Sequence, residues 1–352
     1  MTLARAALLV GLVFALAALA SGCSGSGDSS SAATATATVT VTTTDTVAGA
    51  SSGGPADSLQ REFVRVVADV SPSVVQIETS QGLGSGVVYD GMGDIVTNAH
   101  VVGAAKSVKV TLSNGSRHSG TVVGTFPPND VAVVHVDGAT PRPATFRERT
   151  RIAVGDIVLA IGNPLGLRSS VTQGIVSSLG RTVSEGNGVA LPSVIQTSAA
   201  INPGNSGGAL VDLRSEVIGI PTLAALDPEF GSTPAAGIGF AIPSSTVRRI
   251  ADQLIATGKV TTSGRAFLGV QVATLVNGGV LVASVQAGGP AAHAGMKQGD
   301  LIVAVNGRTV QSTDDLATVL AQIKPGTTIP VKVDRHGNTM TLHVKVGELQ
   351  SP

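Results

Sequence analysis

One serine of this chain lies in a stretch that suits neither a helix interior nor a strand interior. Ser206 belongs to INPGNSGGAL, residues 201–210, where it is surrounded by two asparagines, a proline and three glycines. Glycine and proline weaken both regular elements, so the stretch predicts a tight turn that exposes the hydroxyl. A serine hydroxyl becomes a nucleophile when a base takes its proton and a third group orients that base.

A histidine and a carboxylate elsewhere in the chain fit those two roles. His100 follows a predicted strand in DIVTNAHVV and lies on a turn of small residues that carries the imidazole. His118 follows the turn signal NGSR and is expected to be merely exposed, and His135 belongs to the alternating run VAVVHV and is expected to be an ordinary strand residue. The matching acid is Asp130 in PPNDVAVV, because the start of a Val-rich strand can bury one carboxylate behind an imidazole. The residues therefore predict a triad in the order His100, Asp130, Ser206, which is the order of chymotrypsin-type enzymes.

Several segments around these residues resemble the HtrA (Deg) family of serine proteases. They are TNAHVV, NDVAVV, AAINPGNSGGAL, AIGNPLGL (160–167) and GIGFAIP (237–243), within a likeness that covers about residues 59–349. The resemblance implies a mainly β fold: a chymotrypsin-like double β-barrel protease domain, followed by a PDZ domain of the α+β class. It also implies an ATP-independent endopeptidase that degrades or processes misfolded or unassembled proteins. The sequence has no G-x-x-x-x-G-K-[ST] loop, which argues against ATP use.

The same resemblance assigns the groups around the reacting carbonyl. It implies that the N–H groups of Gly204 and Ser206 form the oxyanion hole. The expected substrate-pocket residues are Ala200, six before the nucleophile, at the floor, with Ile201, Ile238 and Phe240 as apolar walls. An uncharged pocket predicts cleavage after Val, Ala, Ile or similar residues.

Three positions depart from the family pattern. Ser198 stands where Asp is usual, Pro221 where Asn is usual and Ala209 where Pro is usual. Proline has no N–H, so one backbone hydrogen bond near the cleft is expected to be missing at Pro221. The sequence leaves open what the missing charge at Ser198 would have done.

An α/β-hydrolase is the competing interpretation of the serine turn, because GNSGG also fits the nucleophile elbow G-x-S-x-G. That fold requires a helix after the serine and the order Ser, acid, His. The strand-like run GALVDLRSEVIGI follows instead, and the chain shows no βαβ pattern. These features favour the protease interpretation.

Short Val- and Ile-rich runs, separated by Gly, Asn, Asp and Pro, must position the triad. The predicted strands are 73–79, 83–89, 94–97, 107–112, 119–125, 130–136, 157–161, 171–177, 194–198, 208–212, 216–220 and 237–242. Many short strands at close spacing favour barrels or sandwiches. Helical spacing of apolar residues predicts helices over 58–69 and after Pro243. The protease domain is thus expected over 58–258, with a polar linker at 259–264.

A separate module is expected over residues 265–349. Its segments AFLGV and GDLIVAVNG resemble the bacterial PDZ domain, and Ser312 and Gly326 are the expected cap and stop of a helix that presents Leu316, Val319, Leu320 and Ile323. A PDZ domain adds a peptide C-terminus to its sheet edge and holds the carboxylate with backbone N–H groups. The expected peptide-binding residues are Phe267, Leu268, Gly269, Val270, Leu316 and Leu320. The alternative is a structural β-domain that binds no peptide.

The N-terminal residues predict export. The apolar and small run at 6–20 suits a signal peptide and is short for a membrane span, which needs about 20 residues. It ends in ASGC, which resembles a bacterial lipobox and predicts a signal peptide over 1–23 with lipidation of Cys23, although Ala20 stands where Leu is usual. A plain secretory signal or an uncleaved anchor are the alternatives. Residues 24–57, rich in Ser, Thr, Ala and Gly, predict a flexible tether.

Composition limits the partners. Lys plus Arg and Asp plus Glu both number 23, so no electrostatic footprint for nucleic acid is present, and the single cysteine excludes an intrachain disulfide. No cofactor or metal is expected. The expected partners are unfolded or misfolded protein substrates, peptide C-termini and the bacterial membrane, while the resemblance implies a homotrimer formed near residues 58–70. A chaperone-like or peptide-sensing protein with weak or absent proteolysis is the alternative function, and the intact triad favours the enzyme.

Overall fold

The computed structural model describes residues 54–80, 82–138, 141–147, 152–163, 170–186, 189–202, 204–227, 233–276 and 278–351. The predicted signal peptide, the lipidation of Cys23 and nearly all of the predicted tether lie outside these residues. Within the described part of the chain, no helix is long and apolar enough to cross a membrane.

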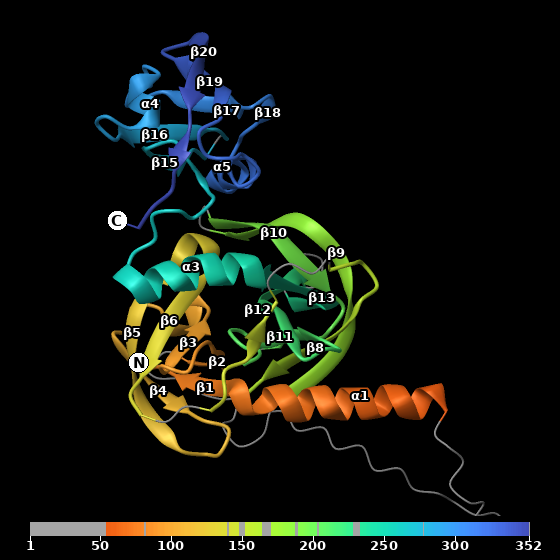
Figure 1. Cartoon of the computed structure of the whole chain (residues 1–352). Coiled ribbons are helices and arrows are strands. Elements are labelled where there is room, and N and C mark those ends of the chain that lie inside the picture. Colours follow the sequence, from red (N-terminus) through yellow and green to blue (C-terminus); the bar gives the residue numbers. More distant parts are fainter. Residues whose placement is uncertain are drawn as a thin grey trace, which may run out of the picture. The chain divides into compact units, whose positions relative to one another are not determined.

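Six strands close into a first antiparallel barrel in the order β1-β2-β3-β6-β5-β4 (Figure 1). They are β1 (Val74–Glu78), β2 (Leu83–Val88), β3 (Asp94–Thr97), β4 (Ser107–Thr111), β5 (Arg117–Phe126) and β6 (Val131–Val136). Alternating side chains point into the barrel, where Ile77, Ile95, Val110 and Val134 are fully buried. The runs that predicted these strands are confirmed, with boundaries that shift by one or two residues.

The second barrel is built from β8 (Ile157–Gly162), β9 (Ser170–Gly186), β10 (Val189–Thr197), β11 (Ala209–Asp212), β12 (Glu216–Asp227) and β13 (Thr233–Pro243), and β7 (Thr145–Phe146) pairs with β12. Their order is β11-β8-β9-β10-β13-β12-β7, and a β11–β12 pairing closes the ring. Strands β9, β10, β12 and β13 are all longer than predicted, and a register shift between Leu191 and Val194 lets β9 and β10 stay paired past Gly180 and Pro192.

Two helices flank the barrels. The helix α1 (Pro55–Val70) begins at Pro55 rather than at residue 58, since proline is well suited to a first helical turn. The spacing of Val247, Ile250, Ala251, Leu254 and Ile255 predicts one apolar face for the helix α3 (Ser244–Thr257), which buries the first four and half-buries Ile255, and Gly258 ends it in the left-handed conformation. Shorter helical turns are η1 (Ser71–Ser73), α2 (Ala99–Val102) and η2 (Pro127–Asn129).

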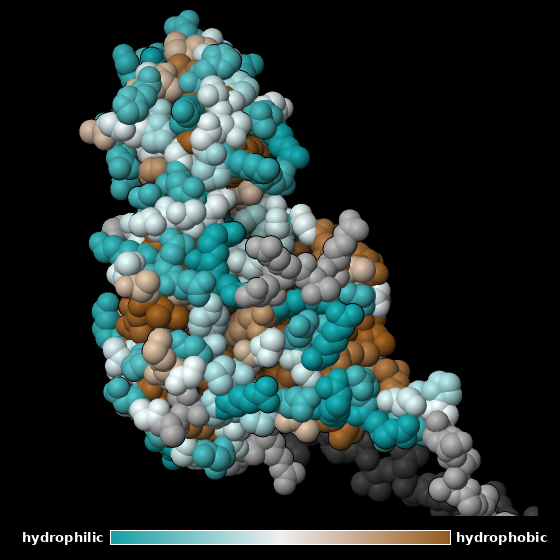
Figure 2. All heavy atoms as spheres, viewed as in Figure 1, coloured by the Kyte–Doolittle hydropathy of each residue, from teal (hydrophilic) through white to brown (hydrophobic). Residues whose placement is uncertain are grey.

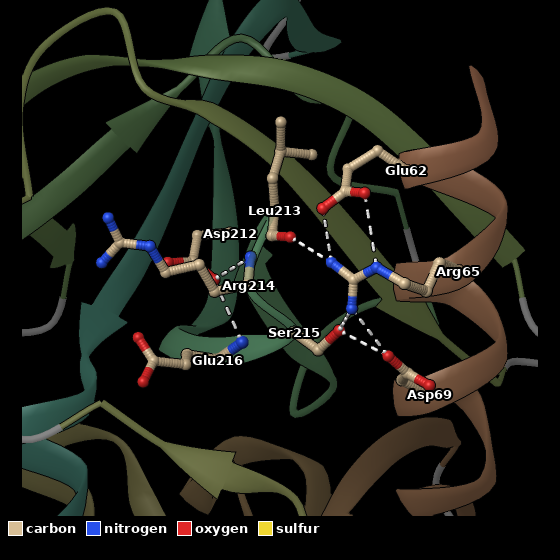
Figure 3. A network of polar contacts seen from close by, with 8 residues as sticks. All are labelled: Glu62, Arg65, Asp69, Asp212, Leu213, Arg214, Ser215 and Glu216. Carbon is tan, nitrogen blue, oxygen red and sulfur yellow. Dashed lines mark hydrogen bonds and ion pairs between the residues drawn. The ribbon is translucent and has the colours of Figure 1, made fainter. Parts of the chain in front are cut away.

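Polar contacts fasten α1 to the turn between β11 and β12 (Figure 3). The Arg65 guanidinium donates to the Leu213 carbonyl at 2.6 Å and pairs with Asp69 at 2.9 Å and with Glu62 at 2.5 Å. The Ser215 hydroxyl donates to the Asp69 carboxylate at 3.0 Å. The second half of α1 is therefore held to the second barrel by charged groups as well as by its apolar side chains.

The C-terminal module has a sheet in the order β15-β16-β17-β19-β20, with β18 paired to β17. Its elements are β14 (Ala266–Phe267), β15 (Val270–Thr274), β16 (Val280–Val285), α4 (Pro290–His293), β17 (Leu301–Val305), β18 (Arg308–Thr309), α5 (Thr313–Leu320), β19 (Thr328–Arg335), β20 (Asn338–Lys345) and β21 (Gly347–Glu348). Ser312 caps α5 as predicted, through a capping box with Asp315. The predicted stop is wrong: α5 ends at Leu320, and Ile323 is buried from the turn that follows.

The predicted linker, residues 259–264, makes hydrogen bonds both to the helix that precedes it and to residues near the C-terminus. The Gln253 side chain of α3 accepts hydrogen bonds from the N–H groups of Thr261 and Thr262, both at 2.9 Å. The Ser263 hydroxyl donates to the Leu349 carbonyl at 2.5 Å, and the Leu349 N–H donates to Arg265 at 2.8 Å. The segment between α3 and β14 is thus bonded to the end of α3 and to the residues that follow β20.

Candidate active site

His100 and Asp130 meet because the strands next to them are paired. β3 precedes His100 and β6 follows Asp130, and Thr97 lies opposite Ala132 in their antiparallel register. The His100 Nδ1 atom lies 2.9 Å from Asp130 Oδ2 and 3.0 Å from Oδ1, and the His100 N–H donates to Oδ1 at 3.0 Å. The Asp130 side chain is 3% exposed and that of His100 is 50% exposed. A buried carboxylate therefore orients an imidazole that remains open to a substrate.

Ser206 is joined to this pair through Thr222 of β12. The Ser206 hydroxyl donates to the Thr222 carbonyl at 2.9 Å. The Thr222 hydroxyl donates to Asp130 Oδ2 at 2.5 Å, and the residue is 3% exposed. The structure thus brings together the three predicted triad residues around a fourth, which no local sequence pattern marks.

The turn that carries Ser206 has the geometry that its glycines predict. The Gly208 N–H donates to the Asn205 carbonyl at 2.9 Å, and the Gly207 N–H donates to Pro221 at 3.0 Å. Gly207 has a φ of +80°, and a Cβ at this position would lie 2.1 Å from the Ser85 carbonyl oxygen. Any other residue type at position 207 would place its Cβ against the backbone of β2, so this position of the turn requires glycine.

The structure gives two of the family departures a local role. Pro221 lies at a register shift between β12 and β13, where a residue without an N–H is accommodated, and its carbonyl still accepts from Gly207. The Ser198 hydroxyl accepts a hydrogen bond from the Ile175 N–H at 3.0 Å, and the Ser198 N–H donates back to Ile175 at 3.1 Å. Ser198 therefore connects the segment before the nucleophile to β9 without a charge.

The predicted pocket residues come from two segments: Ala200 and Ile201 precede the serine turn, and Ile238 and Phe240 lie in β13. Ala200 is exposed, and its carbonyl accepts from the Asn205 side chain at 3.3 Å, beside the serine turn. Ile201 is 6% exposed and packs over Gly239, where a Cβ would lie 2.4 Å from it. On either side of Gly239 in β13 lie Ile238, which is 37% exposed, and Phe240, which is buried in a different core cluster from Ile201. Gly204, a predicted oxyanion donor, is buried in the same turn as Ser206, with a φ of +102°.

The six predicted PDZ residues line one cavity of about 190 Å³. They are Phe267, Leu268, Gly269, Val270, Leu316 and Leu320. The cavity lies between β15 and α5, and β15 is an edge strand whose only neighbour in the described sheet is β16. An extended peptide could add to this edge while an apolar side chain enters the cavity.

Side chains that could bind a metal ion do not cluster in the described part of the chain. No group of three His, Cys, Asp or Glu residues there is placed to share one ion. The polar groups that meet at the site are the His100 imidazole, the Asp130 carboxylate and the hydroxyls of Ser206 and Thr222.

Comparisons with known proteins identify two domains and their relatives. A trypsin-like peptidase domain matches residues 84–220, and a PDZ domain matches residues 266–346. The probable periplasmic serine endoprotease DegP-like of Chlamydia trachomatis is 39% identical over 277 residues, which are 76% of this chain and 54% of that protein. The serine protease Do-like HtrA of Lactobacillus helveticus is 39% identical over 319 residues, 84% of this chain and 76% of that protein. The chain thus spans between about half and three quarters of the length of these relatives.

Solved structures show the same likeness. The crystal structure of the serine endoprotease from Yersinia pestis is 35% identical, with a TM-score of 0.57, over 82% of this chain and 98% of that one. An HtrA-type protease, AlgW, with a decapeptide is 31% identical, with a TM-score of 0.56, over 82% of this chain and 99% of that one.

Proposed function

Because this chain belongs to the HtrA family of serine proteases, we propose that it is an ATP-independent endopeptidase that acts through Ser206, His100 and Asp130. For the reaction, the Ser206 hydroxyl directs its proton to His100 instead of to the Thr222 carbonyl. The Ser206 Oγ then attacks the peptide carbonyl while His100 takes that proton. His100 then gives this proton to the departing amine, which leaves the acyl group on Ser206. A water molecule attacks that acyl group while His100 takes a proton from the water, and His100 returns the proton to Ser206 as the acid product leaves. Asp130 orients the imidazole and stabilises its charged form, and the N–H groups of Gly204 and Ser206 hold the oxyanion.

The single observation that carries this proposal is the chain of contacts from Ser206 through Thr222 to Asp130 and His100. The Thr222 hydroxyl and the His100 imidazole both contact the Oδ2 atom of Asp130. A surface loop that happened to be rich in glycine would not bond its serine to a residue that itself bonds to a buried, histidine-bound carboxylate. We propose misfolded or unassembled proteins as substrates, cleaved after small or branched apolar residues beside Ala200.

Covalent labelling tests the catalytic proposal. A fluorophosphonate should label the wild-type protein at Ser206 and should not label Ser206→Ala. Ser206→Ala, His100→Ala and Asp130→Ala should each lose most digestion of unfolded casein, because a triad acts as a unit. Mass mapping of the casein fragments should show cuts after Val, Ala or Ile. Full activity of purified Ser206→Ala would refute the assignment, and cuts dominated by Lys or Arg would refute the pocket.

We also propose that the protein works outside the cytoplasm, attached by a lipid at Cys23. The sequence at 6–23 and the periplasmic names of two relatives support this location. If the intact mass of the mature protein shows an unmodified Cys23, or a first residue other than Cys23, lipidation at Cys23 is contradicted.

A homotrimer is the oligomer that we propose. Apolar surface is available for it on α1, where Leu59 is 40% and Val64 is 64% exposed. Further apolar surface lies on β9, where Val171, Ile175 and Leu179 are exposed, and Figure 2 shows hydrophobic side chains gathered on the side of the second barrel where β9 runs. Light scattering on the purified protein gives its mass in solution, and a monomer would refute the trimer.

A further inference from the structure

The hydroxyl of Ser85 is buried beside the nucleophile turn and belongs to the other barrel. Ser85 lies in β2 and is 0% exposed. Its Oγ donates to the Gly204 carbonyl at 2.5 Å and accepts from the Asn163 N–H at 2.8 Å. A serine hydroxyl has one proton to donate, so this side chain is committed to the Gly204 carbonyl. One hydroxyl therefore connects β2 of the first barrel, the end of β8 in the second barrel and the turn that carries Ser206.

The backbone of Ser85 contacts the same turn at two further points. Its N–H donates to the Ser206 carbonyl at 2.8 Å. Its carbonyl accepts from the Thr97 hydroxyl at 2.7 Å and lies against Gly207, where no Cβ would fit. Ser85 thus binds the carbonyl groups on both sides of Asn205, which directly precedes the nucleophile.

One of the proposed oxyanion donors lies between these two carbonyls along the chain. The N–H of Ser206 belongs to the peptide group between Asn205 and Ser206, so it lies between the two carbonyls that Ser85 holds. Gly204 has a φ of +102°, where glycine has wide rotational freedom and no side chain restrains it. The peptide group between Gly204 and Asn205 is therefore held from two directions: its N–H donates to the Asn202 carbonyl within the turn at 3.0 Å, and its carbonyl accepts from Ser85 of the other barrel.

We propose that Ser85 is a positioning residue that holds the N–H groups of Gly204 and Ser206 toward the oxyanion. The inference rests on the proposed function, because it concerns the same reaction. Ser85 touches neither the substrate nor the reacting atoms; it acts by fixing the two carbonyls of the turn. A preorganised donor costs no rearrangement when charge develops, which is why its orientation affects the rate of the chemical step.

The alternative is a serine that only satisfies buried backbone groups. Ser73 is a matched example in this chain: it is 3% exposed, and its hydroxyl donates to the Arg142 carbonyl at 2.6 Å. Replacing either serine by alanine removes a buried hydroxyl and the hydrogen bond that it donates to a backbone carbonyl, and at Ser85 the Asn163 N–H loses its acceptor as well. Both variants are expected to lower the thermal midpoint. Only the loss at Ser85 should also change catalysis.

The experiment compares wild type, Ser85→Ala and Ser73→Ala on a small chromogenic peptide, with a peptide aldehyde and its matching alcohol as inhibitors. The aldehyde adds to Ser206 and places its oxygen in the oxyanion hole, whereas the alcohol only occupies the pocket.

In Ser85→Ala, kcat should fall by about 10- to 100-fold with little change in KM, since removal of a whole oxyanion donor costs about 10²–10³-fold. Aldehyde affinity should fall in parallel, and alcohol affinity should stay unchanged. Ser73→Ala should keep kcat within about twofold, because its hydroxyl makes no contact with the turn.

A folded Ser85→Ala variant with wild-type kcat and aldehyde affinity would overturn the inference. If this variant does not fold, Ser85→Cys replaces it, because a thiol fills the site but is a weak donor. A folded Ser85→Cys variant with wild-type kcat would overturn the inference equally. Failure of the proposed function gives a different result: the wild-type protein itself would then neither cleave the peptide nor react with a fluorophosphonate at Ser206.

Discussion

At the scale of residues, a second pairing of an acid with a histidine lies in the first barrel. Asp94 of β3 lies opposite His135 of β6, and the His135 Nδ1 atom is 2.9 Å from Asp94 Oδ1. The hydrogen bond to Asp94 raises the pKa of His135 above its ordinary value. Burial raises the pKa of Asp94, with Asp90 close by. The pair has no contact with Ser206 that would give it a part in the reaction, and we expect it to affect stability.

The sign of this effect follows from the raised pKa of His135. The folded protein holds the imidazole proton more tightly than the unfolded chain. The stabilisation is therefore complete below the unfolded pKa of about 6.5 and is lost as pH rises through the higher folded value. His135→Gln should lower the thermal midpoint more at about pH 5.5 than at about pH 8.5. The control is His343→Gln, at an exposed position of β20. An equal loss for His135→Gln at both pH values would contradict the prediction.

At the scale of elements, the attachment of α1 depends on one arginine. Val66 and Val70 are the buried residues of the helix, and Arg65, together with Asp69, supplies the polar contacts to the β11–β12 turn (Figure 3). The arginine side chain is 44% exposed, and exposed ion pairs contribute little on their own. The hydrogen bond to the Leu213 carbonyl is different, because it joins two elements that are far apart in the sequence.

Arg65→Ala should therefore loosen α1 without unfolding the barrels. Amide hydrogens of α1 should exchange faster with solvent, while those of β1 to β6 keep their protection. Arg61→Ala is the matched control on the same helix, because the described contact of Arg61 is with Ser58 of α1 itself. Exchange from α1 is measured by mass spectrometry after digestion. Equal acceleration in both variants would show that helix charge, and not the contact with the turn, is responsible.

At the scale of the whole molecule, the two modules make regulation by peptides testable. A peptide with a hydrophobic C-terminal residue should bind along β15 and fill the cavity lined by Leu268, Leu316 and Leu320. Amidation of that C-terminus should abolish binding, because it removes the charge that the backbone N–H groups hold. Peptide binding is measured by calorimetry. Equal affinity of the amidated and free peptides would refute this use of the module.

The same peptide separates two forms of coupling. If it only tethers substrate, cleavage of a small chromogenic peptide should not change. If it binds the active arrangement of the protease more tightly, that cleavage should accelerate, since a ligand with equal affinity for both states shifts nothing. The control is the PDZ variant Leu316→Glu, in which a charge would enter the apolar cavity and prevent either effect.

The sequence by itself determined much of this protein. Alternating Val and Ile runs predicted the strands of both barrels, since a strand repeats its environment every two residues. Ser312 signalled the start of α5 because capping is a local interaction. Residue type and short motifs singled out His100, Asp130 and Ser206, whose catalytic roles we propose, and motifs also marked the residues that line the PDZ cavity.

Only the tertiary structure decided which groups surround the triad. Thr222 bonds to Asp130 across 92 positions, and Ser85 bonds to Gly204 across 119 positions. A hydrogen bond between such distant residues leaves no periodic pattern in the sequence, because it depends on how two barrels pack. The long arms of β9 and β10 were missed for a related reason: pairing with a neighbouring strand keeps polar and proline residues extended where local preference alone would end the strand.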